Sequence, residues 1–271
     1  RKMDALKIKM PEQVPPGVAR AFEVLVPTIL VLIVMSTIGW LSSTFLGLPL
    51  NDLISTYVQE PLKAIIGNNI FAVMILYVII SLFWCVGMHG NNMVAAIKEP
   101  LFLPMIVENM EAFSKGQEAP NTLNLTMLQM FGEWGGSGVT LALVVAIFIF
   151  GKREDNRAIA TLSIVPGMFN INETVTFGIP LVLNPILDIP FILAPVAAVF
   201  VGYLLTVIGF CPKVVVQTPW TCPPILMGFL ATGGNIMGAI SQLVVFVVAV
   251  VIYTPFFIAY EKYQNRQSAE A

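Results

Sequence analysis

The chain carries very little charge. Only 11% of its 271 residues are Asp, Glu, Lys or Arg, whereas 57% are hydrophobic. Soluble domains usually contain about 25% charged residues, so this chain cannot cover itself with a surface that is compatible with water. The sequence therefore predicts a protein of the lipid bilayer. The formal net charge is −2 and no long basic block occurs, so we expect no nucleic acid among its partners.

The sequence also lacks the motifs of several enzyme classes. It contains no Walker A motif, no GxGxxG fingerprint and no nucleophile elbow, which excludes ATP hydrolysis by this chain. Its three cysteines, Cys85, Cys211 and Cys222, have no metal-type spacing, and we interpret them as packing residues rather than disulfide partners. His89 is the only histidine, and no His/Cys/Asp cluster occurs. We therefore expect neither a bound metal nor a cofactor.

Long apolar runs predict an all-α polytopic membrane protein with about five transmembrane helices. A helix that spans the bilayer needs roughly 20 apolar residues. Five stretches meet or approach this length: 21–46, 70–86, 139–150 with the Gly-rich sequence before it, 191–210 and 236–260. Residues 51–67 have an amphipathic pattern, and we expect them to form an interfacial helix.

Polar ends divide the chain into three parts. We interpret residues 1–20 as a polar connector, residues 21–260 as the transmembrane domain and residues 261–271 as a cytoplasmic tail. The first residues hold neither an initiator methionine nor a signal peptide, so we expect an N-terminal part before them. Basic residues follow the third and fifth spans, which predicts that the ends of these two spans are cytoplasmic. Counting back over five spans then places residues 1–20 outside, although this segment is itself basic. Either one crossing is miscounted or one span is a half-pass.

Three apolar stretches are interrupted by Gly, Pro, Asn and Thr. They comprise residues 129–138, 161–190 and 218–235, where we expect re-entrant or discontinuous segments. Irregular backbone at membrane depth persists only where it is buried in protein or lines a water-filled cavity. Three such segments in one chain therefore predict a cavity.

Glu173 is the most informative charged residue. It lies in FNINETVTFGIP, residues 169–180, with no Lys or Arg within twelve residues on either side. A charge at the centre of a membrane helix costs at least about 2.5–3.5 kcal/mol, so such residues usually face a cavity or a partner. The structural alternative is a carboxylate that is paired with a cation at an interface. Asn170 and Asn172 offer amide donors and acceptors for hydroxyl groups.

Further candidate binding residues lie in the stretches WCVGMHGNNM, FGEWGGSG and QTPWTCPP. They are Trp84, His89, Gly90, Asn91, Glu133, Trp134 and Trp220. A capping histidine and tryptophans anchored at the lipid headgroups are the structural alternatives. Aromatic walls with a few convergent polar groups are typical of small-molecule pockets. The set predicts a neutral, polyhydroxylated ligand.

Three motifs resemble a known family. NINETVTFGIPLVLNP at 170–185, KMPEQVPPGVARAF at 9–22 and WCVGMHGNN at 84–92 are similar to the lactose/cellobiose-type enzyme IIC membrane component of the bacterial sugar phosphotransferase system (PTS). The resemblance covers essentially the whole chain, and it extends to the diacetylchitobiose-specific members. It implies a multi-pass homodimer in the bacterial cell membrane. This chain would be mainly the C-terminal, sugar-binding half of the protomer.

The resemblance also implies a mechanism. The membrane component binds a disaccharide from outside, and a separate IIB protein, phosphorylated on cysteine, transfers phosphate to the 6-hydroxyl of the sugar. The phosphoryl donor would therefore lie on another chain. Glu173 would contact this hydroxyl and act as general base, and His89 would contact the sugar. The other lining residues would be Trp84, Gly90, Asn91, Asn172, Glu133, Trp134 and Trp220.

One residue departs from the family pattern, and one alternative function stays open. Family members have proline after the glutamate, whereas this chain has Thr174. The alternative is a proton-coupled secondary sugar transporter in which Glu173 carries the proton. Such a protein would accumulate unmodified sugar with a proton gradient and no phosphodonor. The sequence does not discriminate among chitobiose-, cellobiose- and lactose-type sugars.

Overall fold

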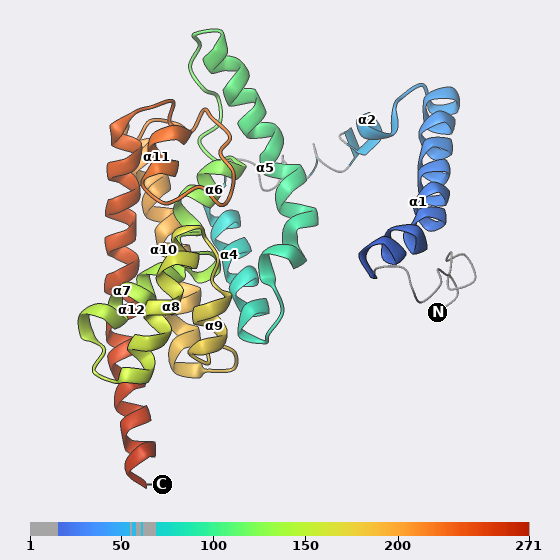
Figure 1. Ribbon diagram of the computed structural model, residues 1–271. Helices are drawn as coiled ribbons and strands as arrows, with labels where there is room; N and C mark the ends of the chain where they lie inside the picture. Colours follow the sequence, from blue (N-terminus) through green and yellow to red (C-terminus); the bar gives the residue numbers. More distant parts are fainter. Residues whose placement is uncertain (1–15, 55, 58–60, 62–68, 271) are drawn as a thin grey trace. The chain divides into compact units, whose positions relative to one another are not determined.

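The computed structural model describes residues 16–54, 56–57, 61 and 69–270. The described residues form helices and connecting loops, and none of them forms a strand (Figure 1). The all-α expectation is therefore confirmed. The chain divides into two compact units, residues 1–62 and 63–271.

The first unit contains one long apolar helix. Helix α1 (Pro16–Leu41) continues into a π-helical turn (Ser42–Leu46), and the short helix α2 (Leu50–Ile54) follows. Residues Leu25–Leu46 are long and apolar enough to cross a membrane, which agrees with the first predicted span. Most of the predicted interfacial helix, residues 51–67, lies outside the described residues.

The second unit contains the remaining helices. They are α4 (Ile70–Cys85), α5 (Gly90–Ser114), α6 (Leu125–Gly132), α7 (Thr140–Phe150), α8 (Glu154–Met168), α9 (Glu173–Gly178), α10 (Pro185–Val207), α11 (Leu226–Ala231) and α12 (Ile236–Glu270). Helix α5 was not predicted. Helix α12 continues through residues 261–270, so most of the segment interpreted as a tail is helical.

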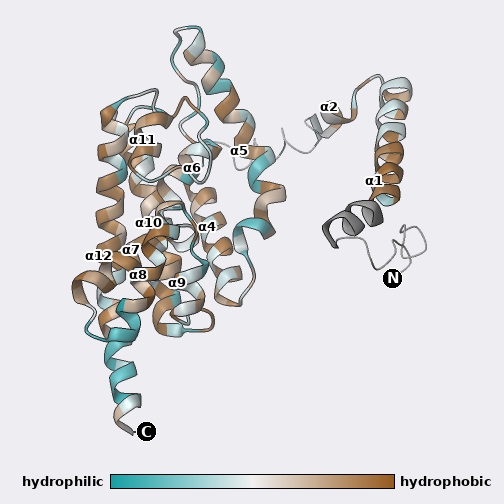
Figure 2. Cartoon of the chain, in the orientation of Figure 1, coloured by the Kyte–Doolittle hydropathy of each residue, from teal (hydrophilic) through white to brown (hydrophobic). Residues whose placement is uncertain are grey.

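The predicted spans correspond to real helices, although one of them is short. Besides the span in the first unit, Leu125–Phe150, Pro185–Val207 and Ile236–Ala269 are long and apolar enough to cross a membrane. Helix α4 has 16 residues. At 1.5 Å per residue it rises about 24 Å, which is less than the hydrocarbon thickness of about 30 Å. Figure 2 shows that α12 is hydrophobic over most of its length and hydrophilic only near its C-terminal end.

Helices α10 and α12 have the most extensive helix–helix contact in the second unit. Helix α10 packs against α12 and α4, and α12 also packs against α7. Helix α10 also approaches α6 closely at a small residue, because a Cβ atom added at Gly202 would overlap the ring of Phe131. Tyr253 of α12 donates a hydrogen bond to the carbonyl oxygen of Gly138 at 2.6 Å. This bond fixes the interruption before α7 to the longest helix of the unit.

The interrupted segments are present where the sequence predicted them. The break between α6 and α7 contains Gly135, Gly136 and Gly138, all with positive φ. The chain reverses between α8 and α9 at Asn170, whose φ is 62°. An irregular stretch also connects α10 with α11, and Ile225 lies there at a φ of 70°. These three interruptions position several polar side chains of the interior, among them Glu133, Ser137, Asn170 and Asn172.

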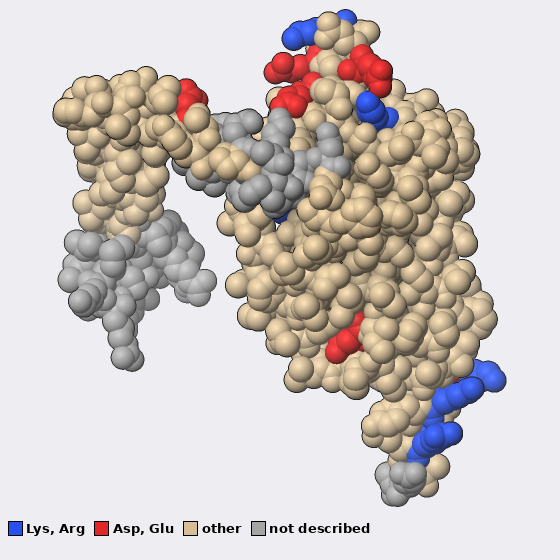
Figure 3. Space-filling view, turned by 180° about the vertical axis from the view of Figure 1, so that it is seen from behind, with Lys and Arg blue, Asp and Glu red and all other residues tan. Residues whose placement is uncertain are grey.

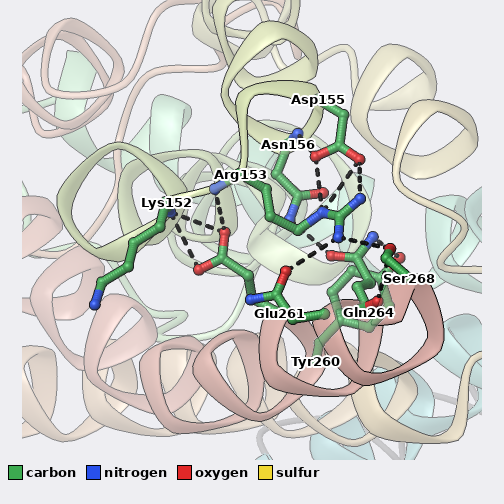
Figure 4. Close-up of polar contacts among 9 residues, drawn as sticks. Lys152, Arg153, Asp155, Asn156, Tyr260, Glu261, Gln264 and Ser268 are labelled. Carbon is green, nitrogen blue, oxygen red and sulfur yellow. Dashed lines mark hydrogen bonds and ion pairs between the residues drawn. The ribbon is translucent and has the colours of Figure 1, made fainter. Parts of the chain in front are cut away.

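Hydrogen bonds at the C-terminal end of α12 hold the turn between α7 and α8 (Figure 4). The buried carboxylate of Glu261 accepts hydrogen bonds from the backbone N–H groups of Lys152 and Arg153, each at 2.8 Å. Arg153 in turn donates to both carboxylate oxygens of Asp155, and this contact lowers the pKa of Asp155. Exposed charged side chains gather at the two ends of the second unit, and the face between them is almost uncharged (Figure 3).

Candidate functional site

The interruptions enclose a cavity of about 560 Å³. Its wall comes from the first half of α5, the end of α6, the break before α7, the turn between α8 and α9, and the stretch before α11. The lining residues are His89, Asn91, Asn92, Ala95, Lys98, Glu99, Gln129, Glu133, Gly136, Ser137, Asn170, Ile171, Asn172, Glu173 and Trp220. Most of these side chains are polar, although the molecule is apolar as a whole.

Glu173 lies at the first position of α9, directly after the chain reversal. Its side chain is exposed to the cavity rather than packed against a neighbour. Within the described part of the chain, its carboxylate accepts no hydrogen bond and pairs with no cation. The prediction that Glu173 faces a cavity rather than a paired cation therefore agrees with the geometry. A carboxylate in this position is free to accept a hydrogen bond from a ligand hydroxyl.

His89 both caps a helix and lines the cavity. It is the N-cap residue of α5, and its Nδ1 atom accepts a hydrogen bond from the backbone N–H of Asn92 at 3.3 Å. A neutral imidazole that accepts at Nδ1 carries its proton on Nε2, which leaves Nε2 as a donor. The ring of Trp84 lies against His89 with a centroid separation of 4.6 Å. His89 therefore caps α5 and borders the cavity at the same time.

A buried ion pair forms one wall of the cavity. Nζ of Lys98 lies 2.8 Å from Oε1 of Glu133, and the two side chains are 6% and 11% exposed. The same Nζ atom donates to Oδ1 of Asn91 at 2.9 Å, and Nδ2 of Asn91 donates to Oγ of Ser137 at 3.0 Å. A buried charge is tolerated when it is paired and hydrogen-bonded. Glu133 is therefore balanced by a cation, in contrast to Glu173.

The structure places six of the nine predicted site residues on the cavity: Glu173, His89, Asn91, Asn172, Glu133 and Trp220. The other three lie behind its wall. Trp84 is buried beneath His89. Trp134 is buried as well; its Nε1 donates to the carbonyl of Met130 and its ring stacks on Phe246. Gly90 packs against the backbone of Ile80, where a Cβ atom would overlap the Ile80 carbonyl.

Sequence reasoning missed Lys98, which pairs with Glu133. One signal was available, because Lys98 and Glu99 are adjacent charges in an otherwise apolar stretch. Charged residues of this kind usually face a bundle interior or a water-filled cavity. The described residues hold no group of three or more His, Cys, Asp or Glu side chains that could bind a metal ion.

An apolar helical molecule that encloses a polar cavity between interrupted helices is a membrane protein built around a polar site. Comparison with known proteins identifies the class further. Residues 1–195 match the family described as "Phosphotransferase system, EIIC", and the chain belongs to this family.

Individual relatives cover nearly all of the chain. It is 35% identical, over 97% of its length, to the "PTS system cellobiose-specific EIIC component" of Lactococcus lactis. It is also 35% identical, over 95% of its length, to the "PTS system oligo-beta-mannoside-specific EIIC component" of Bacillus subtilis. These matches cover 57% and 58% of the two relatives, so the chain spans little more than half of their length.

A solved structure has the same fold. It is the crystal structure of the transporter ChbC, the IIC component from the N,N'-diacetylchitobiose-specific phosphotransferase system. The TM-score is 0.78 at 37% identity, and the match covers 98% of this chain and 61% of that one. The fold of this chain is therefore that of a helical EIIC transporter.

Proposed function

We propose that this chain forms the sugar-binding and translocating part of a bacterial EIIC component. It imports a disaccharide, and a separate phosphorylated IIB protein phosphorylates the 6-hydroxyl of the sugar. The observation that carries the proposal is the cavity that joins Glu173, His89 and Trp220 in a chain of the EIIC family.

The cavity has the properties of a sugar site. Its volume of about 560 Å³ lies within the range of about 300–1,000 Å³ that is common for small-molecule pockets. Trp220 is 54% exposed and borders the cavity, so its ring can pack against the apolar C–H face of a sugar ring. The amides of Asn92, Gln129 and Asn172 border the same space and can exchange hydrogen bonds with hydroxyl groups.

The charges in the cavity have different roles in this proposal. The Lys98–Glu133 pair is internally neutralised, so it contributes hydrogen bonds without a net charge. Glu173 has no such partner and takes the proton from the 6-hydroxyl as the phosphoryl group arrives. A general base acts through a hydrogen bond to the proton that it removes. His89 holds the sugar through its Nε2–H group.

The assembly is part of the proposal as well. The functional unit is a homodimer in the bacterial cell membrane, and each protomer includes an N-terminal half besides the residues of this chain. Residues 21–260 form the C-terminal sugar-binding domain between a polar connector and a cytoplasmic tail. The matches cover 57%, 58% and 61% of three relatives, which supports a protomer that is longer than this chain.

A direct test uses the full-length protein in membrane vesicles with phosphorylated IIB. Diacetylchitobiose, cellobiose and lactose are offered separately, and we expect the transported sugar to appear as its 6-phosphate. Membership of the EIIC family supports this outcome over proton-coupled transport. Accumulation of unmodified sugar, driven by a proton gradient without IIB, would overturn the proposal.

A further inference from the structure

Asn170 occupies the point at which all three interrupted segments meet. Its Nδ2 group donates to the carbonyl oxygens of Trp220 and Cys222, at 2.7 and 3.2 Å. Its Oδ1 atom accepts a hydrogen bond from the backbone N–H of Gly135 at 3.0 Å. One buried amide thus connects the α8–α9 turn with the break before α7 and with the stretch before α11. We call Asn170 and its three partners, Gly135, Trp220 and Cys222, the junction.

The backbone at Asn170 suits this role. Its φ of 62° lies in the left-handed region, which asparagine adopts more readily than most residues other than glycine. The turn also packs closely on Gly136, where a Cβ atom would lie 2.8 Å from the carbonyl oxygen of Asn170 and 3.0 Å from Cβ of Asn172. The Nδ2 group of Asn172 donates to the carbonyl of Ser137 at 3.1 Å. The turn therefore has little freedom to shift along its neighbours.

The junction connects the two sides of the cavity. Trp220 contributes a side chain to the wall and its carbonyl oxygen to Asn170. Glu173 follows Asn170 by three residues and contributes the unpaired carboxylate. The relative position of this carboxylate and the Trp220 ring consequently depends on the amide of Asn170.

We propose that Asn170 is a positioning residue, which sets the distance between the Glu173 carboxylate and a sugar that is stacked on Trp220. This inference rests on the proposed function. A misplacement of about 1 Å can cost about 100-fold in rate when reacting groups must be aligned. Asn170 therefore controls the rate of phosphoryl transfer more than the affinity for the sugar.

Asn170→Asp is the informative variant. Aspartate tolerates the left-handed backbone, and it keeps the acceptor for Gly135. It loses both donated hydrogen bonds, because an ionised carboxylate has no donor and faces the carbonyls of Trp220 and Cys222. Asn170→Gly removes all three hydrogen bonds without burying a new charge and retains the backbone conformation. Asn170→Gly therefore tests the proposal where the aspartate variant does not fold.

Asn109 provides a matched control. Its buried amide donates to the carbonyls of Asn121 and Val214, at 2.7 and 2.8 Å, and accepts from the N–H of Asn121 at 2.8 Å. Asn109 thus repeats the hydrogen-bond pattern of Asn170, but it does not line the cavity. Asn109→Asp therefore measures the general effect of disrupting a buried amide.

The experiment compares these variants in the full-length protein with phosphorylated IIB, and rates are expressed per folded molecule. For Asn170→Asp and Asn170→Gly we expect the maximal rate of sugar phosphorylation to fall about 100-fold, with a much smaller change in half-saturating sugar concentration. Asn109→Asp should retain a rate close to that of the wild type. Sugar-dependent quenching of the Trp220 fluorescence, assigned with Trp220→Phe, reports binding independently.

The outcomes separate the two proposals. If the Asn170 variants turn over as fast as Asn109→Asp, the positioning role is wrong. If they lose sugar affinity and keep the maximal rate, it is wrong as well. If the wild type binds sugar but phosphorylates none with IIB, the proposed function fails instead.

Discussion

The Nζ atom of Lys98 and the Oε1 atom of Glu133 lie 2.8 Å apart, and both side chains are almost completely buried beside the cavity. Residues 98 and 133 belong to different segments of the chain, so this pair joins α5 to the break before α7. Breaking a buried pair by removing one partner typically costs about 3–5 kcal/mol, because the other charge stays buried and unpaired. The loss of stability is much smaller when both charges are removed together.

Lys98→Met should therefore lower the free energy of unfolding by about 3–5 kcal/mol. The double variant Lys98→Met/Glu133→Gln should recover a large part of this loss. Thermal unfolding of the purified protein in detergent measures both effects. The control is Lys115→Met, which removes the exposed pair with Glu111 at 3.9 Å; exposed pairs contribute about 0–1 kcal/mol. Equal stability of Lys98→Met and Lys115→Met would contradict the prediction.

Glu173→Gln should abolish IIB-dependent phosphorylation and preserve sugar binding. Glutamine keeps the size of the side chain and can still hydrogen-bond the sugar, but it is no longer able to remove a proton. Among the described residues no hydrogen bond holds the Glu173 side chain, so the fold should be unaffected. Phosphorylation assays and equilibrium sugar binding are measured on the same preparation. Full phosphorylation by the variant would show that Glu173 is not the base.

His89→Ala combines two losses, which a second variant separates. The alanine variant removes the ring from the cavity and also the N-cap of α5, and loss of a cap typically costs about 1 kcal/mol. His89→Asn restores a good N-cap but not the ring. Both variants should bind sugar more weakly in titrations monitored by fluorescence, whereas only His89→Ala should also lower the unfolding temperature. Wild-type affinity in His89→Asn would assign the histidine to capping alone.

Gly138→Ala should destabilise the protein more than Gly116→Ala. Both glycines have positive φ, at 78° and 69°, so both substitutions strain the backbone. A Cβ atom at Gly116 meets nothing within 4 Å, whereas one at Gly138 overlaps the ring of Phe191. The difference between the two unfolding temperatures therefore isolates the steric cost at the break before α7. Equal temperatures would show that the Phe191 ring moves aside freely.

Acidification should remove the contribution of the Arg153–Asp155 pair. Its arginine lowers the pKa of Asp155, so the pair stabilises the folded state above the ordinary aspartate value of about 3.9. The contribution is lost as the pH falls through the lower pKa of the folded state. Asp155→Asn should therefore unfold at a lower temperature than the wild type at neutral pH, and the difference should shrink below about pH 4. A difference that is independent of pH would contradict this prediction.

The sequence predicted the apolar helices and the interruptions well, because both have local causes. Long apolar runs mark α10 and α12, and Gly, Pro and Asn mark the breaks. Helix α5 escaped prediction because Pro100, Pro104 and several charged residues disturb its apolar pattern. The Lys98–Glu133 pair escaped as well, since its partners are 35 residues apart and only the fold brings them together.

Among the site residues, too, those with a local cause were predicted and those that depend on the tertiary structure were not. Glu173 and His89 stood out because polar residues are costly in apolar surroundings. Trp134 stood out because aromatic side chains often wall small-molecule pockets, but its indole N–H finds a partner one turn back in the chain and its ring packs in the core. Local sequence shows that a polar group needs a partner, and only the tertiary structure shows whether that partner is the protein or a ligand.

The walls of the cavity come from α5, α6 and the interrupted segments, whereas α10 and α12 contribute no lining residue. The two helices with the most extensive mutual packing therefore leave the lining of the cavity to other segments. Relatives named for cellobiose, for oligo-beta-mannoside and for diacetylchitobiose match this chain over 95–98% of its length. Under the proposed function, a change of the preferred sugar requires substitutions only in these short segments and leaves α10 and α12 as they are.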